Sequence, residues 1–347
     1  MAVTLPEIGT VQTLEDMARK PYCLHLELTN LCNANCVFCG YQFQQRPIQT
    51  MTDAVFEKAL TDFLDEGGGS ATLTPIVGDA LIDPQFLERV RRLRAAPRVD
   101  RIRLITNGIL LDRFGIENIV TSGLDYLGIS TAGFDEQTYE RVYRSKSYRR
   151  MRDNVLELLE CNERLGWPIQ RVAILLRSDR PYRELIQSDD FQAVLRYRPA
   201  IQCATSYSSF GDRLVSVDLP ERMNLFDEPN AKPEPCQRLY DSPIVLSDGT
   251  VVACECYSAM DAIADLGIGN ILNDSLGNIW RSSRMARLRD GFIDGSINDT
   301  CRRCDNYQDL TLYQKAEGKE RARLNRLRHE GGWEIRTPDA EGYWLNP

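Results

Sequence analysis

The sequence predicts an α/β fold in which six strand–helix units form an open partial barrel, followed by a small C-terminal domain. Between about residues 20 and 210, apolar β-branched segments alternate regularly with amphipathic segments. Such alternation is typical of a parallel sheet with helical crossovers, and six units favour an open partial barrel. A connector rich in proline and acidic residues, 227–235, then breaks the alternation and is interpreted as a linker. We therefore expect an N-terminal extension (1–19), the barrel (20–225), a small domain (226–312), and a charged helix with a tail (313–347).

The strands of the barrel are expected where short apolar runs are bounded by turn residues. These runs are 23–29, 71–77, 101–106, 126–130, 171–176 and 202–206. Helices are expected where apolar residues recur at helical spacing, at 52–64, 84–94 and 136–165. In parallel α/β folds the functional groups gather at the carboxyl ends of the strands, so the loops after these runs are the expected place for a site.

Composition and charge exclude several classes of protein. The chain has 347 residues, of which 43% are hydrophobic, and this is ordinary for a globular protein with a full core. A net charge of −8 argues against a nucleic-acid or anionic-membrane partner. The sequence shows no apolar run that reads as a signal peptide or a membrane span. Eleven cysteines without a secretion signal indicate a reducing cytoplasm and metal binding.

A loop of three cysteines directly follows the first expected strand. Cys32, Cys36 and Cys39 are separated by three and then two residues, a spacing that lets one loop wrap a compact inorganic centre. Thiolates select zinc or iron–sulfur clusters, and a four-iron cube needs four ligands. Three protein ligands would leave one iron open for a ligand that is not protein. The alternative is a zinc site with a distant fourth ligand, in a chain whose two histidines are His25 and His329.

This spacing, with the aromatic Phe38 before the last cysteine, resembles the signature of the radical S-adenosylmethionine (SAM) superfamily. The resemblance implies a 4Fe-4S cluster whose open iron chelates the amino and carboxylate groups of SAM. It also implies that an electron from this cluster cleaves the sulfonium, and that the 5′-deoxyadenosyl radical takes a hydrogen atom from the substrate. An external electron donor such as flavodoxin or ferredoxin is then expected.

Loops after the later strands resemble weaker motifs of the same superfamily. The segment 77–81 stands where the family carries a Gly-Glu element that meets the SAM amino group, with aspartate in place of glutamate. The segment 106–108 resembles a Thr-Asn-Gly turn, and 128–131 resembles the segment whose hydroxyl meets the ribose or carboxylate. Each segment alone is also compatible with an ordinary turn. The resemblance implies SAM contacts from Phe38, Gly78, Asp79, Thr106, Asn107, Ser130 and Thr131. Arg144 and Arg177 are candidates for a bidentate pair with the carboxylate or for solvated surface positions.

A second set of cysteines, Cys236, Cys254, Cys301 and Cys304, lies in the C-terminal part. Between the first two, an Asp-Gly pair at 248–249 separates two apolar arms, which predicts a β-hairpin that brings them close. A helical stretch, 276–289, then returns the chain to the last two. Four thiolates are a complete ligand set for a cluster, and structural zinc is the alternative.

This layout resembles the shortened "twitch" form of the SPASM domain in the radical SAM family. Residues 267–280 resemble that domain's Gly-Asn-Ile and Ile-Trp segment, and no cysteine follows Cys304. The resemblance therefore implies one auxiliary cluster, and two 4Fe-4S clusters in the chain. Cys256 is left over as an alternate ligand, a hydrogen-atom donor or a small residue. Cys23, Cys161 and Cys203 are expected to be buried small side chains.

The layout is similar to that of the aminocyclitol and sugar oxidases of this family, the 2-deoxy-scyllo-inosamine dehydrogenases among them. This implies oxidation of a secondary alcohol on a small hydroxylated natural-product intermediate, with the auxiliary cluster accepting an electron. A base or polar group near the hydroxyl is needed, and the candidates after the sixth strand are Tyr207, Asp212 and Arg213. The alternatives are radical 1,2-diol dehydration, epimerisation with a thiol hydrogen donor, peptide modification, and a cysteine-rich metal-binding protein without catalysis.

Overall fold

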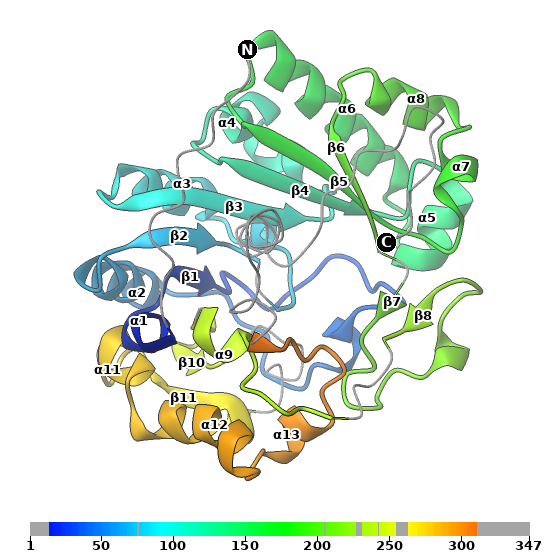
Figure 1. Cartoon of the computed structure of the whole chain (residues 1–347). Coiled ribbons are helices and arrows are strands. Elements are labelled where there is room, and N and C mark those ends of the chain that lie inside the picture. The colour runs from blue at the N-terminus through cyan, green and yellow to red at the C-terminus, as the bar shows by residue number, and fades with distance from the viewer. Residues whose placement is uncertain are drawn as a thin grey trace, which may run out of the picture.

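The computed structural model describes residues 14–74, 76–204, 206–226, 231–241, 243–254 and 263–310. Within these residues nine strands form one sheet in the order β11-β10-β9-β1-β2-β3-β4-β5-β6 (Figure 1). Cys256, the residues 227–230 of the expected linker, and the expected helix and tail after residue 312 lie outside the described residues.

Six strands of this sheet are parallel neighbours in chain order, and they confirm the α/β class and the partial barrel. They are β1 (Cys23–Leu26), β2 (Gly69–Thr72), β3 (Val99–Thr106), β4 (Tyr126–Thr131), β5 (Arg171–Arg177) and β6 (Ala200–Ala204). The first two are shorter than, or shifted from, the predicted runs. After Leu26 and Thr72 the chain leaves the ladder, and its backbone forms the loops that carry the candidate site.

The helices of the described residues are α1 (Leu14–Arg19), α2 (Asp53–Asp65), α3 (Phe86–Ala95), α4 (Ile116–Val120), α5 (Glu136–Tyr143), α6 (Tyr148–Arg164), α7 (Tyr182–Leu185), α8 (Asp189–Leu195), α9 (Arg238–Asp241), α10 (Ile263–Leu266), α11 (Leu276–Trp280), α12 (Ser283–Asp294) and α13 (Asp299–Arg302). Helices α2, α3, α4 and α6 connect the barrel strands and cover one side of the sheet, and α9–α13 lie near the C-terminal hairpin (Figure 1). Four 3₁₀ turns are described: η1 (Gly40–Phe43), η2 (Ala80–Ile82), η3 (Leu111–Phe114) and η4 (Ser216–Asp218).

Two stretches that were predicted as single helices are each divided. The stretch 136–165 is α5 and α6, because Arg144 adopts a left-handed backbone conformation with φ 48° that ends α5. The stretch 276–289 is α11 and the start of α12, because the Ser282 side chain accepts a hydrogen bond from the Met285 N–H and begins a new helix.

The C-terminal hairpin extends the barrel sheet. Its strands are β9 (Ile244–Val245) and β10 (Thr250–Val252), and the predicted turn is present with Gly249 at φ +84°. Strand β9 pairs in parallel with β1, with His25 opposite Ile244. A further strand, β11 (Gly267–Asn270), pairs with β10 and was not predicted. Two short strands, β7 (Ser206–Tyr207) and β8 (Asn224–Leu225), form a separate parallel pair after β6.

The pairing register shows which face of the hairpin the second set of cysteines packs against. Ile244 shares a face with His25 across the β1–β9 pair, and Val252 shares it across the β9–β10 pair. Both belong to a buried apolar group that also contains Cys254 and borders Cys301 and Cys304. Members of the second set therefore pack against the face of β9 and β10 that carries Ile244 and Val252.

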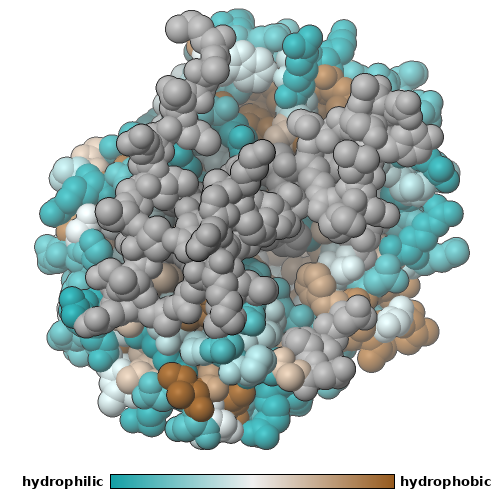
Figure 2. All heavy atoms as spheres, viewed as in Figure 1, coloured by the Kyte–Doolittle hydropathy of each residue, from teal (hydrophilic) through white to brown (hydrophobic). Residues whose placement is uncertain are grey.

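The coloured side chains that Figure 2 shows are mostly hydrophilic, with hydrophobic ones in a few places. Large exposed hydrophobic side chains occur mostly one by one, which is normal for a globular protein. In the described part of the chain, no helix has both the length and the apolar character needed to cross a lipid bilayer.

Candidate functional site

The loop of Cys32, Cys36 and Cys39 is fixed by hydrogen bonds on two sides. On one side, the Asn30 side-chain amide donates to the Pro47 carbonyl at 2.8 Å. On the other, the Val37 N–H donates to the Val142 carbonyl of α5 at 2.9 Å. Because both anchors belong to elements outside the loop, the three cysteines project from a supported backbone.

Burial shapes the chemistry of these thiols. It raises the pKa of Cys36 and of Cys39, and it raises the pKa of Cys32 to about 12, to which the nearby Asp79 carboxylate contributes. Without a metal the thiols are therefore protonated at neutral pH. Metal binding must release these protons, because the thiolate is the ligand.

Asp79 holds two loops of the site together. Its carboxylate accepts hydrogen bonds from the Thr106 hydroxyl at 2.8 Å, the Asn107 N–H at 2.9 Å and the Leu81 N–H at 3.1 Å. The Asn107 amide in turn donates to the Asn33 side-chain oxygen at 2.6 Å and lies 3.8 Å from the Cys32 sulfur. Both carboxylate oxygens of Asp79 are engaged, so this side chain positions the Thr106–Asn107 turn against the cysteine loop.

Gly78 explains how the neighbouring loop approaches so closely. Its φ is +93°, and a Cβ at this position would lie 2.3 Å from the Thr29 carbonyl oxygen. The next residue donates its backbone N–H to the Leu31 carbonyl at 2.9 Å. Only glycine fits this close contact between the loop after β2 and the cysteine loop.

An aromatic and arginine cluster surrounds Phe38, between the second and third cysteines. The ring stacks on Tyr207 with centroids 4.9 Å apart and meets Tyr143 edge-on at 5.6 Å. The Arg177 guanidinium lies 5.5 Å from the Phe38 centroid and donates to the Ser130 hydroxyl at 3.2 Å. Four of the sequence-predicted positions, from the cysteine loop, β4, β5 and β7, are thus brought together.

The structure places four other sequence-predicted residues outside the cluster around Phe38. The Thr131 hydroxyl is buried and donates to the Gly133 carbonyl at 3.0 Å. Arg144 donates to the Gln42 side chain at 3.2 Å, at the outer edge of the cysteine loop. Asp212 and Arg213 are exposed on the loop after β7. The same loop exposes Val215 and Val217, and Figure 2 shows hydrophobic atoms at the lower right, over this part of the molecule.

The second set of cysteines lines a single cavity of about 360 Å³, its mouth included. Cys236, Cys254, Cys301 and Cys304 all contribute to its wall, and the remaining lining residues are Leu239, Leu266, Phe292, Thr300 and Tyr307. Burial raises the pKa of Cys301 to about 12 and that of Cys236 to about 11. A neutral, mostly apolar cavity with four thiols suits a centre that takes thiolate ligands.

Of the remaining cysteines, Cys161 is buried as predicted and Cys23 is half-buried. The prediction for Cys203 was wrong, because this side chain is exposed near the end of the edge strand β6. An edge strand has a neighbour on one side only, which leaves its end open to solvent.

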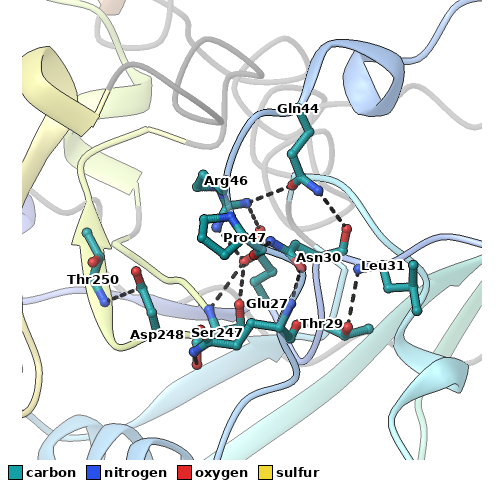
Figure 3. A network of polar contacts seen from close by, with 11 residues as sticks. Glu27, Thr29, Asn30, Leu31, Gln44, Arg46, Pro47, Ser247, Asp248 and Thr250 are labelled. Carbon is teal, nitrogen blue, oxygen red and sulfur yellow. Dashed lines mark hydrogen bonds and ion pairs between the residues drawn. The ribbon is translucent and has the colours of Figure 1, made fainter.

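A buried polar network, not foreseen from the sequence, joins the cysteine loop to the C-terminal hairpin (Figure 3). Glu27, directly after β1, forms a bidentate pair with Arg46 at 2.6 and 2.8 Å. The same carboxylate accepts hydrogen bonds from the N–H and hydroxyl of Ser247, in the hairpin turn. Gln49 completes the contact by donating to the Ser247 carbonyl at 2.9 Å. A separation of 220 residues between Glu27 and Ser247 hides this pairing from any local sequence pattern.

Replacing Glu27 by alanine is expected to lower the free energy of unfolding by about 3–5 kcal/mol, because the buried Arg46 loses its counter-ion. The side chains are 0% and 10% exposed for Glu27 and Arg46. Urea denaturation followed by circular dichroism measures the change. The matched control is Glu57→Ala, which breaks the half-exposed pair with Arg92 and is expected to change stability by less than about 1 kcal/mol. Equal losses in the two variants would contradict a structural role for the buried network.

The residues of both sites fit the iron–sulfur centres that the cysteine patterns imply. At the first site, the donor set is three thiols, and the Asn33 amide nitrogen is buried without a hydrogen-bond partner among the described residues. A polar ligand beside Cys32 would satisfy this nitrogen. Within the described residues, no three His, Cys, Asp or Glu side chains converge closely enough for a single metal ion. At the second site, the fit is instead judged from the one cavity that all four cysteines line.

Two family models match the chain. Residues 26–176 match the Radical SAM superfamily, and residues 236–305 match SPASM, an iron–sulfur cluster-binding domain. Among curated proteins, the GTP 3′,8-cyclase of Chlorobaculum tepidum is 28% identical over 128 residues, which cover 37% of this chain and 38% of the cyclase. The enzyme of the same name from Vibrio cholerae is 24% identical over 196 residues, which cover 55% and 56% of the two chains. The chain thus aligns with well under two thirds of these relatives.

Solved structures share the fold over more of the chain. BtrN in complex with AdoMet and 2-DOIA has a TM-score of 0.55 at 16% identity and covers 82% of this chain and 93% of that chain. Streptococcus suis SuiB bound to the precursor peptide SuiA has a TM-score of 0.57 at 14% identity, with coverages of 84% and 72%. At these identities the similarity shows a common fold.

Proposed function

We propose that this radical SAM enzyme oxidises a secondary alcohol of a small, sugar-like or aminocyclitol substrate to a ketone. The chain joins a radical SAM domain to a SPASM iron–sulfur cluster-binding domain. The observation that carries the proposal is the pairing of a three-cysteine loop after β1 with a four-cysteine cavity beside the hairpin that pairs with β1. The first set leaves a ligand position open and the second set is complete. This combination provides one centre for chemistry and one for accepting an electron.

The similarity to BtrN supports a small hydroxylated substrate, since that structure was solved with AdoMet and 2-DOIA. The similarity to SuiB, solved with a precursor peptide, keeps peptide modification as the alternative that a substrate test must separate. The cyclase relatives align with only part of their length, so their reaction is not transferred to this chain.

The residues of the first site hold and orient the reactants. When bound, the first cluster and SAM would supply the chemistry that removes the carbinol hydrogen atom, and a second cluster, held by Cys236, Cys254, Cys301 and Cys304, would supply an electron acceptor. Cys32, Cys36 and Cys39 would hold the first cluster, and Asp79 keeps Asn107 against that loop. Ser130 and Arg177, hydrogen-bonded to each other, present a hydroxyl and a cation beside Phe38 for a carboxylate or ribose.

The alcohol must also lose its hydroxyl proton. Burial raises the pKa of Tyr207, and its hydroxyl donates to the Ala204 carbonyl at 2.6 Å, so Tyr207 stays protonated and serves as a wall of the site. Asp212, on the exposed loop that follows, is the carboxylate we propose as proton acceptor. The balance is complete: one hydrogen atom, one proton and one electron leave the carbinol carbon and its oxygen. An external donor, flavodoxin or ferredoxin, would supply the starting electron.

The mass of the product and the reductant used per turnover test this reaction. With reduced enzyme, SAM and 2-DOIA or a panel of aminocyclitols, the product is expected to be lighter by two hydrogens. One 5′-deoxyadenosine should form per product, with little sustained reductant, because the electron taken from the substrate is returned. Loss of water with one reductant per product would instead establish a dehydratase. Solvent deuterium uptake without loss of hydrogens would establish an epimerase, and absence of SAM cleavage would leave a metal-binding protein.

A further inference from the structure

The segment 206–210 is one part of the described chain that contacts the neighbours of both cysteine sets. At one end, Tyr207 stacks on Phe38, one residue before Cys39. At the other, the Asp305 carboxylate, one residue after Cys304, accepts hydrogen bonds from the Ser208 hydroxyl and the Ser209 N–H, both at 2.6 Å. A continuous route of covalent bonds, two short hydrogen bonds and one ring stack therefore runs from Cys304 to Cys39.

The backbone after Ser209 needs such support. Phe210, Gly211 and Asp212 have φ of 55°, 64° and 69°, three successive residues in the left-handed region. This conformation is unfavourable for the two residues that are not glycine, and it persists only where the surroundings impose it. The Ser208 hydroxyl also accepts from the Phe210 N–H at 3.0 Å, and the Phe210 ring lies 6.0 Å from Phe43, directly after the cysteine loop.

We propose that Asp305 is a positioning residue that fixes the Tyr207 wall of the first site to the auxiliary cysteine pair, so that loading of the auxiliary site orders segment 206–214. The inference rests on the part of the proposed function that assigns Cys304 as a cluster ligand. A ligated Cys304 has a fixed backbone, and Asp305 next to it then presents its carboxylate in one place. Without that ligand the 8% exposed carboxylate loses its anchor, and the strained loop relaxes.

Hydrogen–deuterium exchange of the peptide covering 206–214 tests the proposal without turnover. Asp305→Ala removes both acceptors, and we expect this peptide to exchange at least about tenfold faster, the effect of losing a hydrogen bond to a charged group. Asp305→Asn is expected to exchange as the wild type does. Its amide oxygen can accept from the Ser209 N–H. Its amide nitrogen can donate to the Ser208 hydroxyl, because a hydroxyl oxygen can accept as well as donate a hydrogen bond. The matched control is Asp299→Ala, two residues before Cys301 and 83% exposed at its side chain, which should leave the peptide unchanged.

Two further variants test this inference separately from the proposed reaction. If Asp305→Ala loads iron poorly, Ser208→Ala removes one donor and leaves the carboxylate, and faster exchange of 206–214 is still expected. In Cys301→Ala/Cys304→Ala protein, the same peptide should exchange faster while peptides of α3 do not. Unchanged exchange in Asp305→Ala and Ser208→Ala, or equal acceleration throughout the chain, would overturn the proposal. Either result would leave the assigned reaction untouched, since SAM cleavage and product mass are measured separately.

Discussion

Replacing Cys32, Cys36 and Cys39 together by alanine is expected to abolish SAM cleavage and to halve the iron content, from about eight to about four per chain. The three cysteines project from one loop that Val142 and Pro47 anchor, and the site has no other thiol among the described residues. The second set lines its own cavity and should load normally. Iron and sulfide analysis after anaerobic reconstitution, with 5′-deoxyadenosine measured by chromatography, gives both numbers.

Cys203→Ala is the control for this variant, because Cys203 is exposed and belongs to neither set. It should keep the wild-type iron content and SAM cleavage. Wild-type protein that contained zinc and no labile sulfide would refute the cluster assignment, whatever the variant does.

Replacing Cys301 and Cys304 by alanine is expected to reduce substrate turnover by at least about a hundredfold while SAM cleavage without substrate falls much less. The pair supplies half of the ligands in the four-cysteine cavity, and the proposed oxidation cannot finish without an acceptor for the second electron. The first site keeps its own ligands and hydrogen bonds in this variant. Turnover and uncoupled cleavage are measured on the same preparation, so that their ratio is independent of the active fraction.

Circular dichroism must accompany this assay, because metal binding in the small domain is part of its folding energy. Cys256→Ala serves as the comparison, and it should retain iron if Cys256 is not a ligand. Turnover at the wild-type rate in the double variant would exclude the auxiliary site as electron acceptor.

The fold was predictable from sequence because its signals are local. Alternating apolar runs identify β3, β4 and β5 well, and the Asp-Gly pair identifies the β9–β10 turn. Strand β11 was missed because two of its four residues are glycine, which sequence patterns assign to turns. One of them, Gly269, is required by packing, since a Cβ there would lie 2.9 Å from Ile279. The division of α5 from α6 depends on the positive φ of Arg144, and no residue type in that stretch predicts a positive φ.

The cysteine ligands of the two sites were predictable from the sequence, but the hydrogen bonds that hold the cysteine-bearing loops in place were not. Cysteine spacing is short-range, so both thiol sets are visible in the sequence. The contacts that hold them are long-range: Asp305 reaches Ser208 across 97 residues, and Glu27 reaches Ser247 across 220. Asp79 illustrates the difference, because the sequence marks the residue while the structure shows its carboxylate bonded to Thr106, Asn107 and Leu81.

The parallel pairing of β9 with β1 has a consequence for assembly and solubility. Without the hairpin, β1 would be an edge strand whose unpaired backbone groups and buried His25 and Glu27 face solvent, and such an edge invites association with other chains. Its partner strand β9 follows more than 200 residues later, so the growing chain must carry this open edge until synthesis has reached the last third. The C-terminal hairpin therefore also covers the edge of β1. The edge of the sheet is then β11, a strand of four residues that offers little template for further pairing.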